Sequence, residues 1–323
     1  MSLSTPRSLA GTSVPSSLEP AAGRRRRRRI SRDQVLSVLL VSPSILAIAV
    51  FVYGFIGWSL RVSLSAWSGL NPDYTFVRLQ QYAALLHDRR FAIDVRNTAI
   101  FTGLFLVVCL TIGFFLAVLL DQRLKGENLF RSIYLFPMAI SFIVTGVIWR
   151  WLMNPATGTR ISGLNLLFDR LGLDSFISRW HTTLPPWGIA FVVIPAVWQM
   201  SGFTMALYLG GLRSVSEDLR EAARVDGANE FQIYRHILVP LLQPVTLSAV
   251  IILGHISLKI FDLIVALSQN DMRLDVPAVY MWRTTFDGNN YGQGAAIGII
   301  MLVTVALLII PYLVYSMRTE ATQ

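Results

Sequence analysis

Six long apolar runs decide what this chain can fold into. Each is about as long as a helix that crosses the hydrocarbon layer of a membrane. Since lipid offers no hydrogen-bond partner to a bare peptide group, each run is predicted to be helical. Hydrophobic residues make up 54% of the 323 positions, more than a soluble domain can bury. We therefore expect an all-α membrane protein with six transmembrane helices, at residues 35–58, 98–120, 133–152, 187–209, 242–267 and 295–317.

The charge distribution indicates how the chain crosses the membrane. Residues 1–34 are rich in Ser, Pro and Ala and include six consecutive arginines, so we expect a disordered basic tail before a transmembrane domain at 35–318 and a short tail at 319–323. The arginines are expected to bind anionic membrane lipid, with a localisation or nucleic-acid signal as the weaker alternative. An N-in, C-in orientation also places more Lys and Arg on the cytoplasmic side. The first run is too long for the apolar part of a signal peptide, so no cleavage is expected.

A polar stretch, 213–240, separates the fourth and fifth runs and is predicted to be helical. Ser216 suits the N-cap position of a first helix. Glu217 and Asp218 then place negative charge in its first turn, where the helix dipole favours it. Gly227 is predicted to end this helix because glycine adopts a left-handed φ without penalty.

A second short helix is predicted to follow that glycine. Asn229 and Gln232 have the spacing of a capping box, and Pro240 is expected to stop the helix before the next span. A membrane protein that builds helix, glycine turn and helix on its inner surface is expected to use it for docking. The longer outer loops are each predicted to contain one short interfacial helix, at 79–86 and 164–171.

The spacing Glu221-Ala-Ala, three residues, Gly227 and then Ile237-x-x-Pro240 resembles the cytoplasmic loop of ABC importer permeases. The resemblance covers about residues 35–318 and is best to carbohydrate-uptake permeases related to the maltose and glycerol-phosphate systems. It implies a six-helix core of the methionine-importer type in the bacterial cytoplasmic (inner) membrane. It also implies three kinds of partner: ABC ATPase subunits, a second homologous permease and an extracytoplasmic sugar-binding protein. The residues that it places against the ATPase are Glu221, Ala222, Ala223, Asp226 and Gly227.

The sequence contains no G-x-x-x-x-G-K-[ST] phosphate loop. Any ATP is therefore expected to be bound by a partner subunit, and this chain is predicted to have no cofactor and no enzymatic activity of its own. Its four histidines are scattered and form no metal-binding motif.

The fourth run carries a first group of candidate substrate contacts. Aromatic faces beside amide donors suit the mixed apolar and hydroxyl surface of a sugar. The resemblance places sugar contacts at Gln199, Met200 and Phe203, and Trp198 precedes them. The alternative is that these residues only pack helices together.

The fifth run carries a second group. A charge at membrane depth costs ~2.5–3.5 kcal/mol on insertion scales, so it usually faces a cavity or a partner. His255, Lys259 and Asp262 are spaced to share one helix face. Lys259 and Asp262 either line the substrate path or simply pair with each other. The resemblance places sugar contacts near Ser257, Ile260 and Phe261.

Together these features predict the permease subunit of an ATP-driven importer for a mono- or oligosaccharide. An ion-coupled secondary transporter is the first alternative, but it would need its own ion site and usually inverted repeats. A polytopic glycosyltransferase is the second, and it would need clustered acids that the outer loops do not show as a motif.

Overall fold

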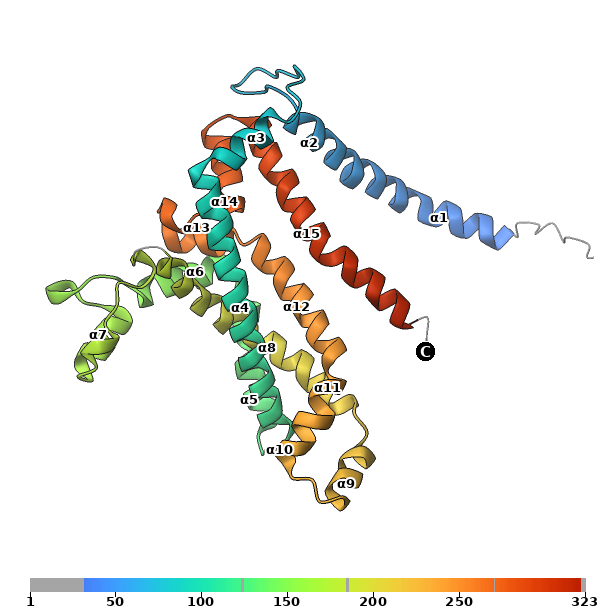
Figure 1. The fold of residues 1–323 in the computed structure, drawn as a ribbon, viewed down its shortest axis with the longest axis vertical. Coiled ribbons are helices and arrows are strands. Elements are labelled where there is room, and N and C mark those ends of the chain that lie inside the picture. The colour runs from blue at the N-terminus through green and yellow to red at the C-terminus, as the bar shows by residue number, and fades with distance from the viewer. Residues whose placement is uncertain (1–31, 123–124, 184–185, 270, 321–323) are drawn as a thin grey trace, which may run out of the picture. The chain divides into compact units, whose positions relative to one another are not determined.

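The computed structural model describes residues 32–122, 125–183, 186–269 and 271–320 (Figure 1). Residues 1–31 and 321–323 of the predicted tails lie outside the described residues, whereas 32–34 begin α1 and 319–320 end α15. Apart from one isolated bridge between Ser65 and Phe76, regular structure in the described part of the chain is helical. The described residues divide into two units, one ending at Gly54 and one beginning at Phe55.

The first unit is one helix, α1 (Arg32–Ile48), followed by a π-helical turn, η1 (Ala49–Gly54). Every side chain from Val38 to Tyr53 is exposed. An apolar helix with exposed side chains suits contact with lipid or another subunit.

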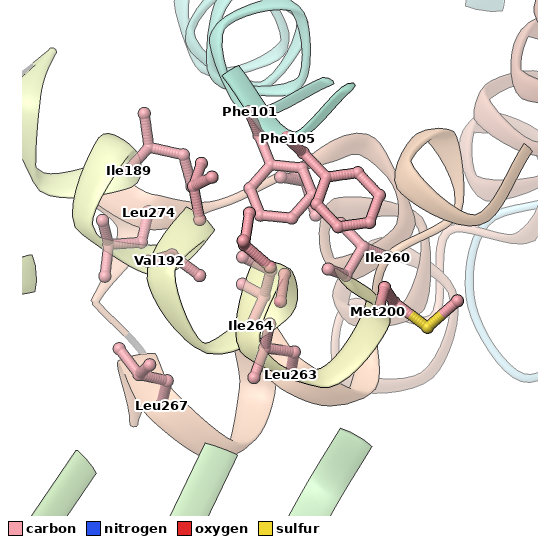
Figure 2. Close-up of a cluster of buried hydrophobic side chains, with 14 of the residues drawn as sticks. Phe101, Phe105, Ile189, Val192, Met200, Ile260, Leu263, Ile264, Leu267 and Leu274 are labelled. Atoms are coloured by element: carbon pink, nitrogen blue, oxygen red, sulfur yellow. The ribbon is translucent and has the colours of Figure 1, made fainter. Parts of the chain in front are cut away.

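Two long helices form the centre of the second unit, α4 (Arg89–Asp121) and α8 (Trp187–Ser214). They approach closely at Gly113, where a Cβ atom would lie 2.6 Å from the side chain of Thr204. Side chains from both helices meet those of α13 (Asp262–Ser268) in the main apolar core (Figure 2). This core includes Phe101 and Phe105 of α4.

The third apolar run is not one straight helix, so the predicted span at 133–152 is wrong in shape. It consists of α5 (Glu127–Leu135), a 3-10 turn η2 (Phe136–Ala139) and α6 (Phe142–Leu152), with a bend of 99°. Pro137 lacks a backbone N–H, and the extended residue Ile140 (ψ 140°) separates the two helices. Ser141 then caps α6 by accepting a hydrogen bond from the amide of Val144.

The fifth run is also interrupted, and the single helix predicted at 242–267 is wrong. The helical stretch before it, Glu230–Leu241, meets its main helix at a bend of 63°, and this main helix ends at Leu258 with Lys259 in the C-cap position. The segments are α10 (Glu230–Ile233), the π-turn η6 (Tyr234–Leu238), α11 (Val239–Leu241), α12 (Gln243–Leu258) and α13.

Two expectations about this part of the chain are wrong. His255, Lys259 and Asp262 do not share a helix face, because that spacing rule requires an uninterrupted helix. Pro240 does not stop the preceding helix. It lies within the continuous helical stretch Glu230–Leu241, directly after the π-turn η6, and the bend comes after it, at Leu242, just before Pro244 of α12.

Of the remaining helices, α2, α3 and α14 lie at the end of the unit opposite α9 (Glu217–Val225) and α10 (Figure 1). The two short helices predicted at 79–86 and 164–171 are present to within one residue, as α3 and α7. By length and composition, four helices of the described chain could each cross a membrane, and up to six if each bent pair counts as one span. The remaining bounds are α2 (Phe55–Ser63), α3 (Gln80–His87), α7 (Gly163–Arg170), α14 (Pro277–Trp282) and α15 (Tyr291–Glu320).

Candidate functional site

The predicted helix, glycine turn and helix is present at one end of the unit. Its first helix is α9 (Glu217–Val225), and Gly227 follows with φ +82°. The capping box of Asn229 and Gln232 is confirmed, with both hydrogen bonds formed. Ser216 occupies the N-cap position, but its side chain makes no capping hydrogen bond.

The two faces of α9 have different environments. Arg220 and Ala223 are buried, while Glu221 and Ala222 are exposed and Val225 is 87% exposed. Asp226 and Gly227 are exposed as well. Of the predicted ATPase contacts, only Ala223 therefore faces its own chain, where it joins an apolar cluster with Leu212 and Ile233. The outward face includes the carboxylate of Glu221 and the small apolar side chains of Ala222 and Val225, and Phe231 of α10 adds a further exposed ring.

The inward face of α9 is attached by an ion pair that the sequence did not reveal. Nη1 of Arg220 lies 2.7 Å from Oδ2 of Asp121, the last residue of α4, and both side chains are buried. Nη2 of Arg220 donates to the carbonyl oxygen of Leu212 in α8 at 2.8 Å. The hydroxyl of Tyr234 donates to the same carboxylate oxygen at 3.0 Å. The ion pair joins residues 99 positions apart, so no local pattern could have indicated it.

A polar cavity of about 620 Å³ lies beside this ion pair. Its walls come from the C-terminal ends of α4 and α8 and from the α9–α10 segment. Burial works against the charge of Arg220, but the hydrogen bond and charge of Asp121 hold the pKa of the guanidinium above its usual value. The guanidinium is therefore charged at any physiological pH.

The candidate substrate contacts of α8 lie on different faces. Successive residues of a helix are about 100° apart, and Trp198 faces an apolar groove between α4, α5 and α8. Gln199 is only 3% exposed and donates from Nε2 to the carbonyl oxygen of Ile140, while its Oε1 has no hydrogen-bond partner. Met200 belongs to the main core, and Phe203 is half-buried against it.

The second group of candidates surrounds the interruption between α12 and α13. Ile260 is buried in the same core as Met200, and the two are seen close together in Figure 2. Ser257 is fully buried, and its hydroxyl donates to the carbonyl oxygen of Gly254 within the helix. Lys259 and Asp262 are exposed, and no salt bridge joins them in the part of the chain that the structure describes.

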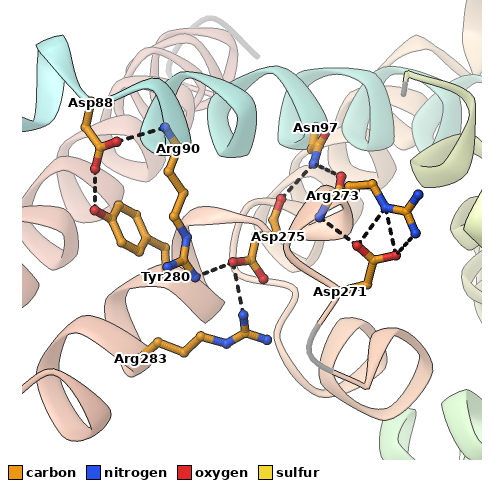
Figure 3. A network of polar contacts seen from close by, with 8 residues as sticks. All are labelled: Asp88, Arg90, Asn97, Asp271, Arg273, Asp275, Tyr280 and Arg283. Carbon is orange, nitrogen blue, oxygen red and sulfur yellow. Dashed lines mark hydrogen bonds and ion pairs between the residues drawn. The ribbon is translucent and has the colours of Figure 1, made fainter. Parts of the chain in front are cut away.

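A second polar centre, not predicted from the sequence, lies where the start of α4 meets the segment before α14 (Figure 3). The carboxylate of Asp275 is fully buried and pairs with Arg90 at 2.5 Å and Arg283 at 3.4 Å. Asn97 donates from Nδ2 to the carbonyl oxygens of Arg273 and Asp275, both at 2.9 Å. Burial raises the pKa of Asp275, and the hydrogen bond from Arg90 opposes that shift.

An aromatic ring extends this network. The guanidinium of Arg90 stacks over Tyr280, 4.5 Å from the ring centroid, and the Tyr280 hydroxyl donates to Asp88 (Figure 3). Burial, followed by the bond to Asp88, raises the pKa of Tyr280. These contacts attach α14 and the segment before it to the start of α4.

Comparison with known proteins gives consistent similarities. Residues 110–319 match the family described as "Binding-protein-dependent transport system inner membrane component". A probable ABC transporter permease protein of Pyrococcus horikoshii is 40% identical over 294 residues, which cover 90% of this chain and 99% of the relative. The xylose/arabinose import permease protein of Haloferax volcanii is 34% identical over 274 residues, 84% of each chain. Among solved structures, a chain of a bacterial ABC transporter involved in alginate import superimposes with a TM-score of 0.74 at 23% identity, covering 90% of this chain and 97% of that one.

Proposed function

This chain belongs to the family of binding-protein-dependent transport system inner membrane components, and from that premise we propose that it is the permease subunit of an ATP-driven sugar importer. It is a multi-pass protein of the cytoplasmic membrane. The sugar class follows from relatives such as the xylose/arabinose import permease. The family match also sets aside the secondary transporter and the glycosyltransferase as functions of this chain.

The observation that carries the coupling part of this proposal is the outward face of α9. Glu221, Ala222 and Val225 are exposed on a helix whose other face is bound to its own chain. Small apolar side chains beside the carboxylate of Glu221 fit a groove on a partner protein, and we assign that partner as an ABC ATPase subunit. Asp226 and the left-handed Gly227 complete the contact, while Ala223 positions the helix from inside.

The orientation and the second permease belong to the same proposal. The N-in, C-in arrangement places α9 in the cytoplasm, where ATP is available. A homologous permease then packs against this one, and the α1 helix, whose described side chains are all exposed, has apolar surface for such a contact. An extracytoplasmic binding protein delivers the sugar to the opposite end of the unit.

We place the substrate path beside the interruption of the fifth span. Transporters commonly bind substrates at discontinuous helices, where unpaired backbone groups are accessible. Ile260 lies in such a segment and shares the core with Met200, next to the turn of α8 that carries Gln199 and Phe203. The remaining candidates are Trp198, Ser257, Lys259 and Asp262. The unpartnered Oε1 of Gln199 supports a role in sugar binding.

Purification of the chain from its native membrane in mild detergent tests the proposal. We expect an ATPase subunit and a second permease to co-purify. Vesicles containing this complex and its binding protein should then hydrolyse ATP while taking up at least one radiolabelled sugar from a panel of glucose, xylose, arabinose, maltose and trehalose. ATP-independent uptake driven by a sodium or proton gradient would refute it.

A further inference from the structure

We propose that Arg220 is a positioning residue that makes α9 move as one body with the cytoplasmic ends of α4 and α8. The proposal rests on the proposed function, in which the outward face of α9 meets the ATPase. It adds the means by which movement of α9 reaches the membrane helices. Arg220 itself touches neither sugar nor nucleotide.

The first support is the direction of the Arg220 side chain. Arg220 directly precedes the exposed Glu221, yet it is buried and extends toward α4 and α8. Docking and anchoring are therefore assigned to opposite faces of the same helical turn. A force applied to the outward face passes through the Arg220 side chain into two helices at once.

The second support is the chemistry at the helix ends. Asp121 is the last residue of α4, where the helix dipole disfavours negative charge. The Leu212 carbonyl lies in the last turn of α8, where carbonyl groups have no intrahelical partner. One guanidinium satisfies both, because its planar fork presents several N–H donors in fixed directions. A lysine could supply the charge but not this geometry.

The third support is that neighbouring contacts also hold together the segments around the Arg220–Asp121 ion pair. Tyr234 of η6 donates to the carboxylate that Arg220 binds, so the segment after α10 is held as well. Arg213 of α8 pairs with Glu127 of α5 at 2.7 Å. The ends of α4 and α8, the start of α5 and the segments α9 and η6 are thus joined by charged hydrogen bonds, which are the stronger kind.

Arg224 provides a matched control. It lies one turn further along α9, but its side chain is 44% exposed and pairs with the exposed Glu217 and Glu230. Exposed pairs of this kind contribute little to stability. Replacing Arg224 by Met removes the same charge from α9 as replacing Arg220 does, but it leaves the ion pair between α9 and α4 in place.

The experiment uses the assembled complex in lipid vesicles. Spin labels at cysteines replacing Gln122 and Asp218, both exposed, report the distance between the end of α4 and the start of α9. Cys109 is replaced by Ala. In the otherwise wild-type complex we expect the same distance without nucleotide and with ATP plus vanadate. A distance that changes with nucleotide would overturn the proposal.

The variants Arg220→Met, Arg220→Lys and Arg224→Met then separate positioning from assembly. We expect Arg220→Met to broaden the distance distribution and to lower ATP hydrolysis stimulated by the binding protein by about 10-fold, as for loss of a typical coupling free energy. Arg220→Lys should be intermediate and Arg224→Met unchanged. Normal stimulation and a narrow distance distribution in Arg220→Met would refute the proposal. If Arg220→Met does not assemble, the proposal is still tested by ATP hydrolysis in Arg220→Lys and by the spin-label distance in the complex that retains Arg220.

A separate crosslink distinguishes this inference from the proposed function. A cysteine replacing Val225 on the outward face should crosslink to the ATPase subunit in the wild-type background. If it does and the distance from Gln122 to Asp218 changes with nucleotide, the docking assignment stands and the role of Arg220 is refuted. If no crosslink forms at any position on that face, the docking assignment itself fails.

Discussion

Gln199 donates a 2.6 Å hydrogen bond from its side-chain amide to the main-chain carbonyl of Ile140. Ile140 lies in the extended link between η2 and α6, outside the regular hydrogen bonding of either helix. The bond therefore connects the middle of α8 to the break in the third span. The same side chain keeps one amide oxygen without a partner, so it can hold the break and still have an acceptor left for a substrate hydroxyl.

Replacing Gln199 by Ala tests both roles. Loss of one neutral hydrogen bond to sugar, about 0.5–1.5 kcal/mol, should weaken transport about 2- to 13-fold. Sugar binding by the separate binding protein and basal ATP hydrolysis should persist. Uptake, expression and ATPase activity are measured together. If expression and ATPase fall in parallel with uptake, Gln199 serves packing alone; full expression with unchanged uptake removes it from the path.

Gly202 and Gly210 form a matched pair on α8. A Cβ atom at Gly202 would lie 1.9 Å from the carbonyl oxygen of Tyr134, whereas one at Gly210 would meet nothing within 4 Å. Gly202→Ala should therefore destabilise the protein by about 1–3 kcal/mol, as overpacking does. Gly210→Ala should be neutral or stabilise by about 0.5–1 kcal/mol through helix propensity. Thermal unfolding in detergent measures both, and equal midpoints would contradict the close contact of α5 with α8.

Gly227→Leu tests the turn after α9. The backbone there has φ +82°, which costs a residue with a side chain roughly 1–2 kcal/mol. A leucine meets no atom of its own chain within 4 Å of Cβ, so we expect normal membrane abundance but loss of ATPase co-purification and transport. Gly227→Asn is the control, since asparagine tolerates this conformation and should retain more coupling. Normal transport in the leucine variant would exclude this turn from the docking surface.

The buried pair at Asp275 should matter more than the exposed pair at Asp271. Asp275→Asn leaves Arg90 and Arg283 without their shared carboxylate, and breaking a buried pair costs about 3–5 kcal/mol. Asp271 pairs with the half-exposed Arg273, so Asp271→Asn should cost about 0–1 kcal/mol. The melting temperatures of the purified complexes provide the comparison. Similar shifts for the two variants would mean that the network at Asp275 does not stabilise the start of α4.

Thiol labelling tests the orientation. Single cysteines replacing Asp169 and Asp287, both exposed, should react with an impermeant reagent added to intact cells, and a cysteine replacing Glu230 should react only after lysis. The Cys109→Ala background removes the native thiol. We choose Asp287 rather than its neighbour Asn289, whose φ of 50° would strain a cysteine. Labelling at position 230 in sealed cells would invert the topology and place α9 on the wrong side for an ATPase.

The sequence by itself determined the features that depend on near neighbours. A long apolar run in lipid must form a helix, because its peptide groups find hydrogen-bond partners only within the run. The turn at Gly227 and the capping box at Asn229 likewise depend on residues within a few positions. The short helices α3 and α7 were predictable for the same reason.

Tertiary structure decided the features that join distant segments. The breaks before Ser141 and after Leu258 occur within runs where hydropathy predicts a continuous helix. Near the first break, the missing side chain at Gly202 of α8 leaves room for the main-chain carbonyl of Tyr134 in α5. The ion pair of Arg220 with Asp121 joins residues 99 positions apart. Its existence depends on how α4 and α8 pack, and the energy of a buried charge pair depends on surroundings that no local pattern specifies.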